Sequence, residues 1–325
     1  MLKHLIMIKE KIEAYAKSLG FDPVGFSPAK FEKSHADFYK NWLKKKYHGG
    51  MKYLEKSGPR RNFAKILANA KTVISLGMNY YHEKKPLRKG FGKVARYAYG
   101  RDYHKIIWKK LKNIEAFIKS LNPKANTKSF TDTAPILERS FAEKAGLGHI
   151  GKNCCLITKE FGSWVFLAEI ITNLEIPEIL PGQTLASNST TSSKSNFPIC
   201  GSCTRCIDSC PTKAIIAPGV IDTRKCISYL TIENKKQIHK KFHTAIKNSG
   251  RLFGCDICQE VCPHNCRAKN RTVKELGEPA IAGDSLELKK IAKIKSDQEF
   301  LKLFAGSPLM RAKRKSLQRN AKCLL

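Results

Sequence analysis

Hydrophobic residues in the first half of the chain recur with the spacing of amphipathic helices and short buried strands. Helices are predicted over residues 5–19, 103–121 and 138–145, and strands over 72–78 and 164–171. Gly20 and Gly146 follow two of the helices, as is common where a helix ends. Because strands and helices alternate, the pattern favours an α/β sandwich for this half.

The second half of the chain has a different pattern. The segment LASNSTTSSKSN is polar and predicts a flexible insertion, cysteines dominate the residues that follow, and from about Glu287 the spacing is helical again. Phe300, Leu301, Leu303 and Phe304 are the expected apolar anchors of this last part. The predicted fold class is α+β, with an α/β domain over 1–172, an insertion over 173–198, a cysteine domain over 199–270 and a basic helical segment over 271–325.

The composition excludes a membrane-spanning protein and a globally disordered one. Hydrophobic residues make up 42% of the 325 residues, enough to bury a core. No run of about 18 apolar residues occurs. The first twenty residues also lack a continuous apolar stretch, so we expect a cytoplasmic protein. The 12 cysteines are therefore expected to be thiols or metal ligands and not disulfides.

The charge is strongly positive. Sixty Lys and Arg residues against 27 Asp and Glu give a formal net charge of +33, which favours a polyanionic partner, although a Lys-rich surface without a partner would give the same average. Basic residues concentrate between Asn79 and Lys110. Interleaved aromatic residues suit the stacking of unpaired bases; they are Tyr80, Tyr81, Phe91, Tyr97, Tyr99, Tyr103 and Trp108. A second basic cluster comprises Arg311, Lys313, Arg314, Lys315, Arg319 and Lys322.

The cysteines carry the most specific chemical pattern. Cys200, Cys203, Cys206 and Cys210, followed by Pro211, have the C-x2-C-x2-C-x3-C-P spacing of bacterial ferredoxins. In that pattern three thiolates bind one [4Fe–4S] cluster and the fourth binds a second cluster.

A second group of cysteines completes the number of ligands that two clusters need. Cys255, Cys258 and Cys262 precede Pro263, and Cys226 lies between the two groups. Exchange of the fourth ligand predicts one cluster on Cys200, Cys203, Cys206 and Cys262, and the other on Cys210, Cys226, Cys255 and Cys258. Zinc is the alternative, since CxxC pairs also bind zinc. The remaining cysteines are expected not to be ligands; they are Cys154, Cys155, Cys266 and Cys323.

One glycine motif is not interpreted as a nucleotide site. Gly146, Gly148 and Gly151 fit G-x-G-x-x-G, but the dinucleotide motif follows a strand, whereas the preceding residues 136–145 are predicted to be helical.

Several long segments, taken in their order along the chain, resemble the epoxyqueuosine reductase family. These segments are ARYAYGRDYHK, TDTAPILERSFAEKAGLGHIGKN, CGSCTRCIDSCPTKAI, CISYLTIE and CDICQEVCPHN, and the similarity extends from about residue 5 to residue 322. The resemblance implies reduction of the epoxide of epoxyqueuosine at the wobble position of tRNA, the last step of queuosine synthesis. It also implies two [4Fe–4S] clusters, a base-off cobalamin between the α/β and ferredoxin-like domains, an external low-potential electron donor and a monomer.

The resemblance also implies roles for individual residues. Asp132 would be the proton donor, with its pKa raised by burial, where the alternative is an Asp that caps the helix starting near Pro135. Cobalamin contacts are expected at Arg60, Tyr97, Asp132, Leu156, Leu167, Ala168, Ile227 and Asp256. Contacts to tRNA are expected at Arg88, Lys89, Lys93 and Asn234. Many family members continue into a HEAT-like tail that this sequence lacks, so tRNA binding is expected to depend more on the basic core.

Two other functions share these features. A corrinoid-dependent reductive dehalogenase also combines a corrinoid with two clusters, but the sequence has no twin-arginine signal and a small substrate does not call for +33. A non-catalytic ferredoxin-type electron carrier would use the first domain only for docking. Cobalamin binding distinguishes this carrier from both enzymes.

Overall fold

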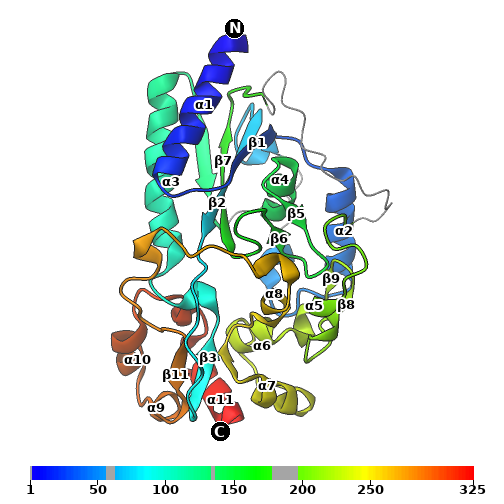
Figure 1. Ribbon diagram of the computed structural model, residues 1–325, viewed down its shortest axis with the longest axis vertical. Coiled ribbons are helices and arrows are strands. Elements are labelled where there is room, and N and C mark those ends of the chain that lie inside the picture. The colour runs from blue at the N-terminus through cyan, green and yellow to red at the C-terminus, as the bar shows by residue number, and fades with distance from the viewer. Residues whose placement is uncertain (1, 56–62, 133–135, 178–196) are drawn as a thin grey trace.

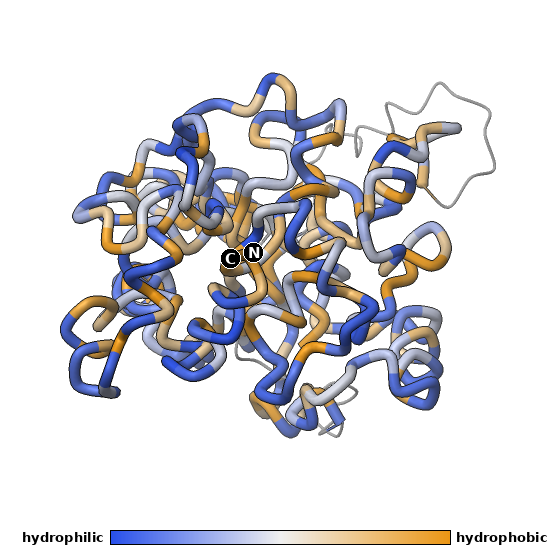
Figure 2. The backbone as a smooth tube through the Cα atoms, turned by 90° about the horizontal axis from the view of Figure 1, so that it is seen from below, coloured by the Kyte–Doolittle hydropathy of each residue, from blue (hydrophilic) through white to orange (hydrophobic). Residues whose placement is uncertain are grey.

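The computed structural model describes residues 2–55, 63–132, 136–177 and 197–325. Its two termini lie at opposite ends of the long axis, so they project close together when the molecule is viewed along that axis (Figures 1 and 2). No described helix combines the length and the apolar character that crossing a membrane requires.

A four-stranded antiparallel sheet forms the centre of the first half. Its order is β1 (Val24–Pro28), β2 (Thr72–Asn79), β7 (Val165–Thr172) and β4 (Thr127–Phe130). All residues of β2 are buried, which explains why apolar residues occupy both faces of the strand and do not simply alternate with polar ones. The strands predicted over 72–78 and 164–171 agree with β2 and β7 to within one residue at each end.

Helices cover both faces of this sheet (Figure 1). On one face, α1 (Leu2–Ser18) and α3 (Tyr103–Leu121) pack their apolar sides against alternate residues of β2, such as Ile74 and Leu76. On the other face, Phe141 of α4 (Glu138–Lys144) packs with Val73 of β2. This layering is the predicted α/β sandwich, and α3 has the predicted bounds.

A second sheet joins the first half of the chain to the second. The strand β3 (Phe91–Val94) pairs in parallel with β10 (Arg251–Phe253) and antiparallel with β11 (Ser285–Glu287). The segments predicted as separate units over 1–172, 199–270 and 271–325 therefore share one sheet.

The C-terminal helices pack on that second sheet. They are α9 (Leu288–Lys293), α10 (Asp297–Phe304) and α11 (Lys313–Leu324). Phe300 and Phe304 are buried, but the prediction that Leu301 and Leu303 are anchors is wrong, because their side chains are about half exposed. The helical repeat places residues four apart on one face, so Leu301 and Leu303 turn away from the core.

The described residues contain further α-helices and β-strands. The helices are α2 (Lys33–Lys44), α5 (Arg205–Asp208), α6 (Ile227–Ile232), α7 (His243–Ser249) and α8 (Ile257–Glu260). The strands are β5 (His149–Ile150), β6 (Leu156–Ile157), β8 (Ile215–Ala217) and β9 (Val220–Ile221).

The structure bears on the predicted insertion and on the glycine motif. Most of the predicted insertion, residues 178–196, lies outside the described residues, whereas Leu174 and Ile176 at its start are buried in the first core. The glycine motif at 146–151 follows the helix α4 and contains the short strand β5, which is not the strand–turn–helix context of a dinucleotide site.

Candidate functional site

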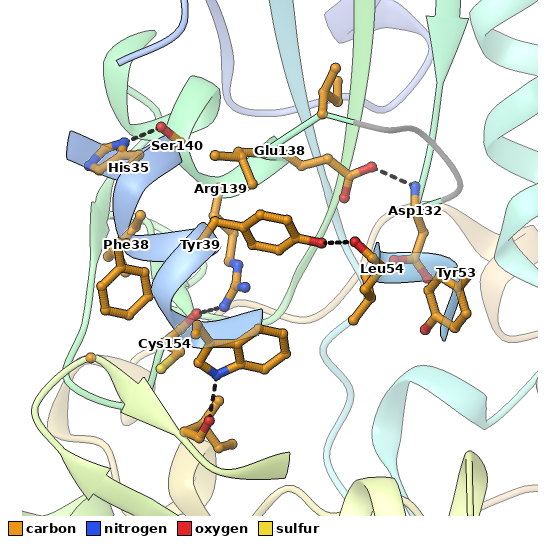
Figure 3. Close-up of a pocket in the computed structure, with 16 residues that line it drawn as sticks. His35, Phe38, Tyr39, Tyr53, Leu54, Asp132, Glu138, Arg139, Ser140 and Cys154 are labelled. Carbon is orange, nitrogen blue, oxygen red and sulfur yellow. Dashed lines mark hydrogen bonds between the residues drawn. The ribbon is translucent and has the colours of Figure 1, made fainter. Parts of the chain in front are cut away.

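A pocket of about 370 Å³ lies between the first half of the chain and the cysteine region. Asp132, Glu138 and Cys154 line it from the first half (Figure 3). Gly219 and Ile221 line it from the second half. Aromatic side chains of α2, among them Tyr39 and Trp42, form part of its wall. Such a mixture of apolar walls and a few polar groups is typical of a small-molecule site.

Asp132 follows β4 and is held at two points. Its backbone N–H donates to Glu138 Oε1 over 2.7 Å, and the Tyr103 hydroxyl donates to Asp132 Oδ2 over 2.6 Å. The residue has a positive φ of 54°, a conformation that Asp adopts more readily than most residues. Hydrogen bonds thus fix both the backbone and the carboxyl group of this loop residue.

The predicted burial of Asp132 is wrong for this conformation, because 62% of its side chain is exposed. β4 ends at Phe130, so Asp132 extends past the edge of the sheet. The helix-capping alternative is also wrong, since α4 begins at Glu138 with Leu137 at its N-cap. The carboxyl group of Asp132 instead faces the start of α3.

His104 lies between two aspartates at the start of α3. Its Nδ1 is 2.7 Å from Asp102 Oδ1, and its Nε2 is 3.7 Å from Asp132 Oδ2. Burial would lower the pKa of His104, but the hydrogen bonds to Asp102 and Asp132 outweigh it and raise the pKa to about 9. Asp102 also caps α3 by accepting from the His104 backbone N–H.

Two more carboxyl groups lie behind Asp132. Burial, and then the charge of Asp132, raise the pKa of Glu138 to about 8. Glu169, on β7, is fully buried, and neither of its carboxyl oxygens has a hydrogen-bond partner among the described residues. Burial, followed by the charges of Glu138 and Asp132, raises the pKa of Glu169 well above its usual range.

The first group of cysteines gathers around one small cavity. Cys200, Cys203, Cys206 and Cys262 line a cavity of about 60 Å³. Burial, followed by the Cys200, Cys262 and Cys203 thiols, raises the pKa of Cys206 to about 11. The structure therefore brings together the four cysteines that the exchange rule assigned to one cluster.

The second group is also assembled from distant parts of the chain. Burial raises the pKa of Cys255 to about 12, and the neighbouring Cys226 adds to this effect. Burial likewise raises the pKa of Cys226, with Cys210 among its neighbours. A hydrogen bond with Cys155, then burial, raises the pKa of Cys258. Thiols that bind iron are deprotonated despite such burial, because the cation stabilises the thiolate.

Cys155 lies beside both groups of cysteines, which the spacing of cysteines in the sequence did not indicate. Its thiol is a neighbour of Cys258 in the second group and of Cys262 in the first. Of the other cysteines expected not to be ligands, Cys266 is exposed and Cys323 lies on α11. Cys154 lines the pocket that also contains Asp132.

The other residues expected to contact cobalamin lie in several environments. Leu156, Ala168 and Ile227 belong to three different hydrophobic clusters, and Leu167 is partly buried beside Leu156. Tyr97 is close enough to both Asp132 and Asp256 for their charges, after burial, to raise its pKa. Asp132 is the member of this set that lines the pocket, and Arg60 lies outside the described residues.

The Asp256 carboxylate is paired with basic groups of the protein. Its Oδ2 accepts from Lys84 Nζ and from the Arg96 backbone N–H, each over 2.9 Å. The Arg251 guanidinium is 3.9 Å away. This buried carboxylate therefore ties the segment before β3 to the cysteine region, next to Cys255.

The predicted tRNA contacts are found on the surface or close to it. Arg88 and Lys89 are exposed and precede β3, while Lys93 is half-buried within it. The Arg88 guanidinium lies 4.1 Å from the centre of the Phe91 ring. Asn234 follows α6, where its Oδ1 accepts from the Lys236 backbone N–H.

The aromatic residues near these cations are mostly not free to stack on bases. Tyr80 and Tyr103 are buried in the first core, and Tyr97 is packed against it, whereas Trp108 is 39% exposed. Part of the second basic cluster is paired within the protein. Arg311 binds Glu233, and Arg314 binds Asp297.

Comparisons with known proteins cover nearly the whole chain. Residues 60–133 match the family described as epoxyqueuosine reductase QueG, DUF1730, and residues 199–265 match the 4Fe-4S double cluster binding domain. The chain is 36% identical to an epoxyqueuosine reductase of Gloeobacter violaceus, covering 97% of this chain and 95% of the relative. It is 40% identical to that of Cellulophaga algicola, over 95% of both chains.

Solved structures are similar over the same extent. An epoxyqueuosine reductase with a tRNA-Tyr epoxyqueuosine-modified stem loop matches with a TM-score of 0.84 and 33% identity, covering 99% of this chain and 81% of the other. A Bacillus subtilis structure, described with its catalytic aspartate loop swung out of the active site, matches with a TM-score of 0.84 and 32% identity, over 99% and 82% of the two chains.

Proposed function

The chain belongs to the epoxyqueuosine reductase family, and from this premise we propose that it reduces the epoxide of epoxyqueuosine in tRNA to the alkene of queuosine. The observation that carries this proposal is the pocket itself. Asp132 is found on one side of it, and Cys154, a neighbour of Cys206 and Cys226, is found on another. The candidate proton donor thus shares a pocket with Cys154, which lies next to one cysteine of each proposed cluster.

Two [4Fe–4S] clusters would supply the electrons. Cys200, Cys203, Cys206 and Cys262 would hold one cluster, and Cys210, Cys226, Cys255 and Cys258 the other. The match of residues 199–265 to the 4Fe-4S double cluster binding domain supports clusters over zinc.

A cobalamin would occupy the pocket between Asp132 and the cysteines. The pocket has walls from both halves of the chain, which suits a group held between two domains. Tyr97, whose pKa is raised by burial and then by the charges of Asp132 and Asp256, would be a further contact of this group. A corrinoid is larger than about 370 Å³, so it would extend beyond this pocket. When bound, its cobalt supplies low-potential electrons or a nucleophile to the epoxide.

Asp132 would deliver protons to the oxygen that leaves the epoxide. Tyr103 and Glu138 orient its carboxyl group and its backbone, so that a substrate entering the pocket meets a fixed acid or base. The apolar wall formed by Tyr39 and Trp42 would exclude water from the reacting atoms.

The substrate would be a tRNA with the modified wobble base, bound in the cytoplasm by a monomer. The net charge of +33 supports a polyanionic substrate, and Arg88, Lys89, Lys93 and Asn234 would contact its backbone or loop. The electrons would come from an external low-potential donor.

Anaerobic reconstitution with iron, sulfide and cobalamin tests the proposal. The reduced enzyme should convert epoxyqueuosine in tRNA to queuosine, as measured by nucleoside analysis. The Cys258→Ala variant should not, whereas the exposed Cys266→Ala variant should behave as the wild type. An enzyme loaded with both cofactors that leaves the epoxide intact would refute the function. Cluster loading without cobalamin binding would favour an electron carrier instead.

A further inference from the structure

His104 connects the candidate proton donor to a second carboxylate and to solvent. Its Nδ1 is 2.7 Å from Asp102 Oδ1, its Nε2 is 3.7 Å from Asp132 Oδ2, and 33% of its side chain is exposed. The imidazole ring is stacked on Tyr103, with ring centres 4.1 Å apart. The Tyr103 hydroxyl donates to the same Asp132 oxygen that His104 faces. Tyr103 and His104 thus both face the Asp132 carboxyl group, and Asp102 holds the far side of the His104 ring.

The contacts of the Asp132 carboxyl group are those of a hydrogen-bond acceptor. It is 62% exposed, accepts a hydrogen bond from Tyr103 and faces the His104 imidazole, which a second aspartate orients. His104 is therefore a partner that could pass a proton to this carboxyl group.

The proposed reaction needs more protons than one carboxyl group can hold. Conversion of an epoxide to an alkene breaks two C–O bonds and releases water, so it consumes two electrons and two protons. One carboxylic acid holds one proton. Asp132 must therefore be protonated again within each turnover, whatever its state at the start.

We propose that His104, oriented by Asp102, is the proton source for Asp132. The inference rests on the proposed function and deepens it. In each transfer, a proton moves from His104 Nε2 to the Asp132 carboxylate as Asp132 gives a proton to the substrate oxygen. His104 then regains a proton from solvent at its exposed side. The two electrons come from the external donor through the clusters.

The direction of transfer is favourable. An alkoxide is far more basic than an imidazole, so a proton moves from imidazolium to the opened epoxide without an unfavourable step overall. With a pKa near 9, His104 is protonated at neutral pH. The charged or titratable groups facing it are Asp102, Asp132 and Tyr103, and Glu138 lies behind Asp132. His104 would act through Asp132, so it is a positioning and proton-supplying residue.

Single-turnover reduction with pre-reduced holoenzyme, measured from pH 6 to 10, tests the inference. The wild-type rate should fall above about pH 9, as His104 loses its proton. His104→Gln should slow reduction at least about tenfold, within the range of general acid effects, and abolish this alkaline decline. Asp102→Asn keeps the helix cap but removes the charge, so the decline should move to lower pH.

A matched control and a rescue distinguish proton supply from structure. His149 also faces a carboxylate, but this carboxylate is Glu143, 3.9 Å from its Nδ1, and not Asp132; His149→Gln should keep the wild-type pH profile. Added imidazole should restore a His104→Ala variant, which a purely structural loss would not allow.

The outcomes separate this inference from the proposed function. Failure of the wild type to form queuosine would refute the function itself. An active wild type whose pH profile is shared by His104→Gln, or a His104→Ala variant that imidazole does not restore, would overturn the role of His104 alone. If the His104→Gln variant does not fold, the Asp102→Asn variant still tests the role of His104: an alkaline decline at the wild-type pH would overturn it.

Discussion

The Tyr103 hydroxyl donates to Asp132 Oδ2 over 2.6 Å, so the first turn of α3 determines where the candidate proton donor points. Glu138 holds the backbone N–H of the same residue over 2.7 Å. Asp132 is thus tied to a helix on each face of the central sheet, although its own side chain is largely exposed.

Replacement of Asp132 by Asn should slow the reaction without damaging the protein. The substitution keeps the shape but removes the transferable proton, so single-turnover epoxide reduction should fall by about 10²–10⁴-fold. Cobalamin and iron content should stay near the wild-type values, which serves as the control. Turnover at the wild-type rate by this variant would remove Asp132 from the mechanism.

Loss of single cysteines should divide the ligands into two sets. The anaerobic wild type should hold about eight iron atoms in two cubane clusters. Cys210→Ala and Cys258→Ala should damage the same cluster, whereas Cys200→Ala and Cys262→Ala should damage the other, as resolved by paramagnetic resonance of each reduced variant. The exposed Cys266→Ala variant is the matched control. One or two zinc ions without iron after anaerobic reconstitution would contradict both assignments.

Charge reversal at Arg88, Lys89 and Lys93 should weaken binding to every tRNA alike. Phosphate contacts release counterions, so the wild-type affinity should fall steeply with salt, and the triple variant should show a shallower slope. Reversal of Lys3, Lys11 and Lys119, exposed cations of α1 and α3, is the matched control. Affinity insensitive to both salt and the first triple variant would show that these cations do not contact the nucleic acid.

The buried Glu169 should make the protein less stable as pH rises. Because its pKa is raised on folding, the folded state keeps a proton that the unfolded chain releases above the ordinary glutamate value. Its contribution is complete below that value and is lost toward the raised pKa, at up to about 1.4 kcal/mol per pH unit. Glu169→Gln should therefore gain stability over the wild type from pH 5 to pH 8, as measured by chemical unfolding.

The matched control for this experiment is the exposed Glu10→Gln, which should leave the pH dependence unchanged. Parallel unfolding curves for the wild type and Glu169→Gln at both pH values would show that Glu169 is ionised in the folded protein.

Local patterns in the sequence were enough to predict several elements and the cysteine groups. The spacing of apolar residues gave α3 its bounds and located β2 and β7, because helical and extended periods depend on residues only a few positions apart. The x2 and x3 spacings marked the ferredoxin pattern for the same reason. The error at Leu301 and Leu303 arose because apolar character alone does not show which helix face is buried.

The surroundings of Asp132 depended on tertiary structure. Tyr103 and His104 precede it by almost thirty residues, and Glu169 follows it by almost forty, on the strand β7. Their meeting is set by the antiparallel register of β4 and β7 and by the packing of α3, which no local pattern specifies. Charge counts likewise could not show that Arg311 and Arg314 are paired within the protein. The sequence by itself determined which chemical groups are present; the long-range contacts between strands and helices decided which of them act on one another.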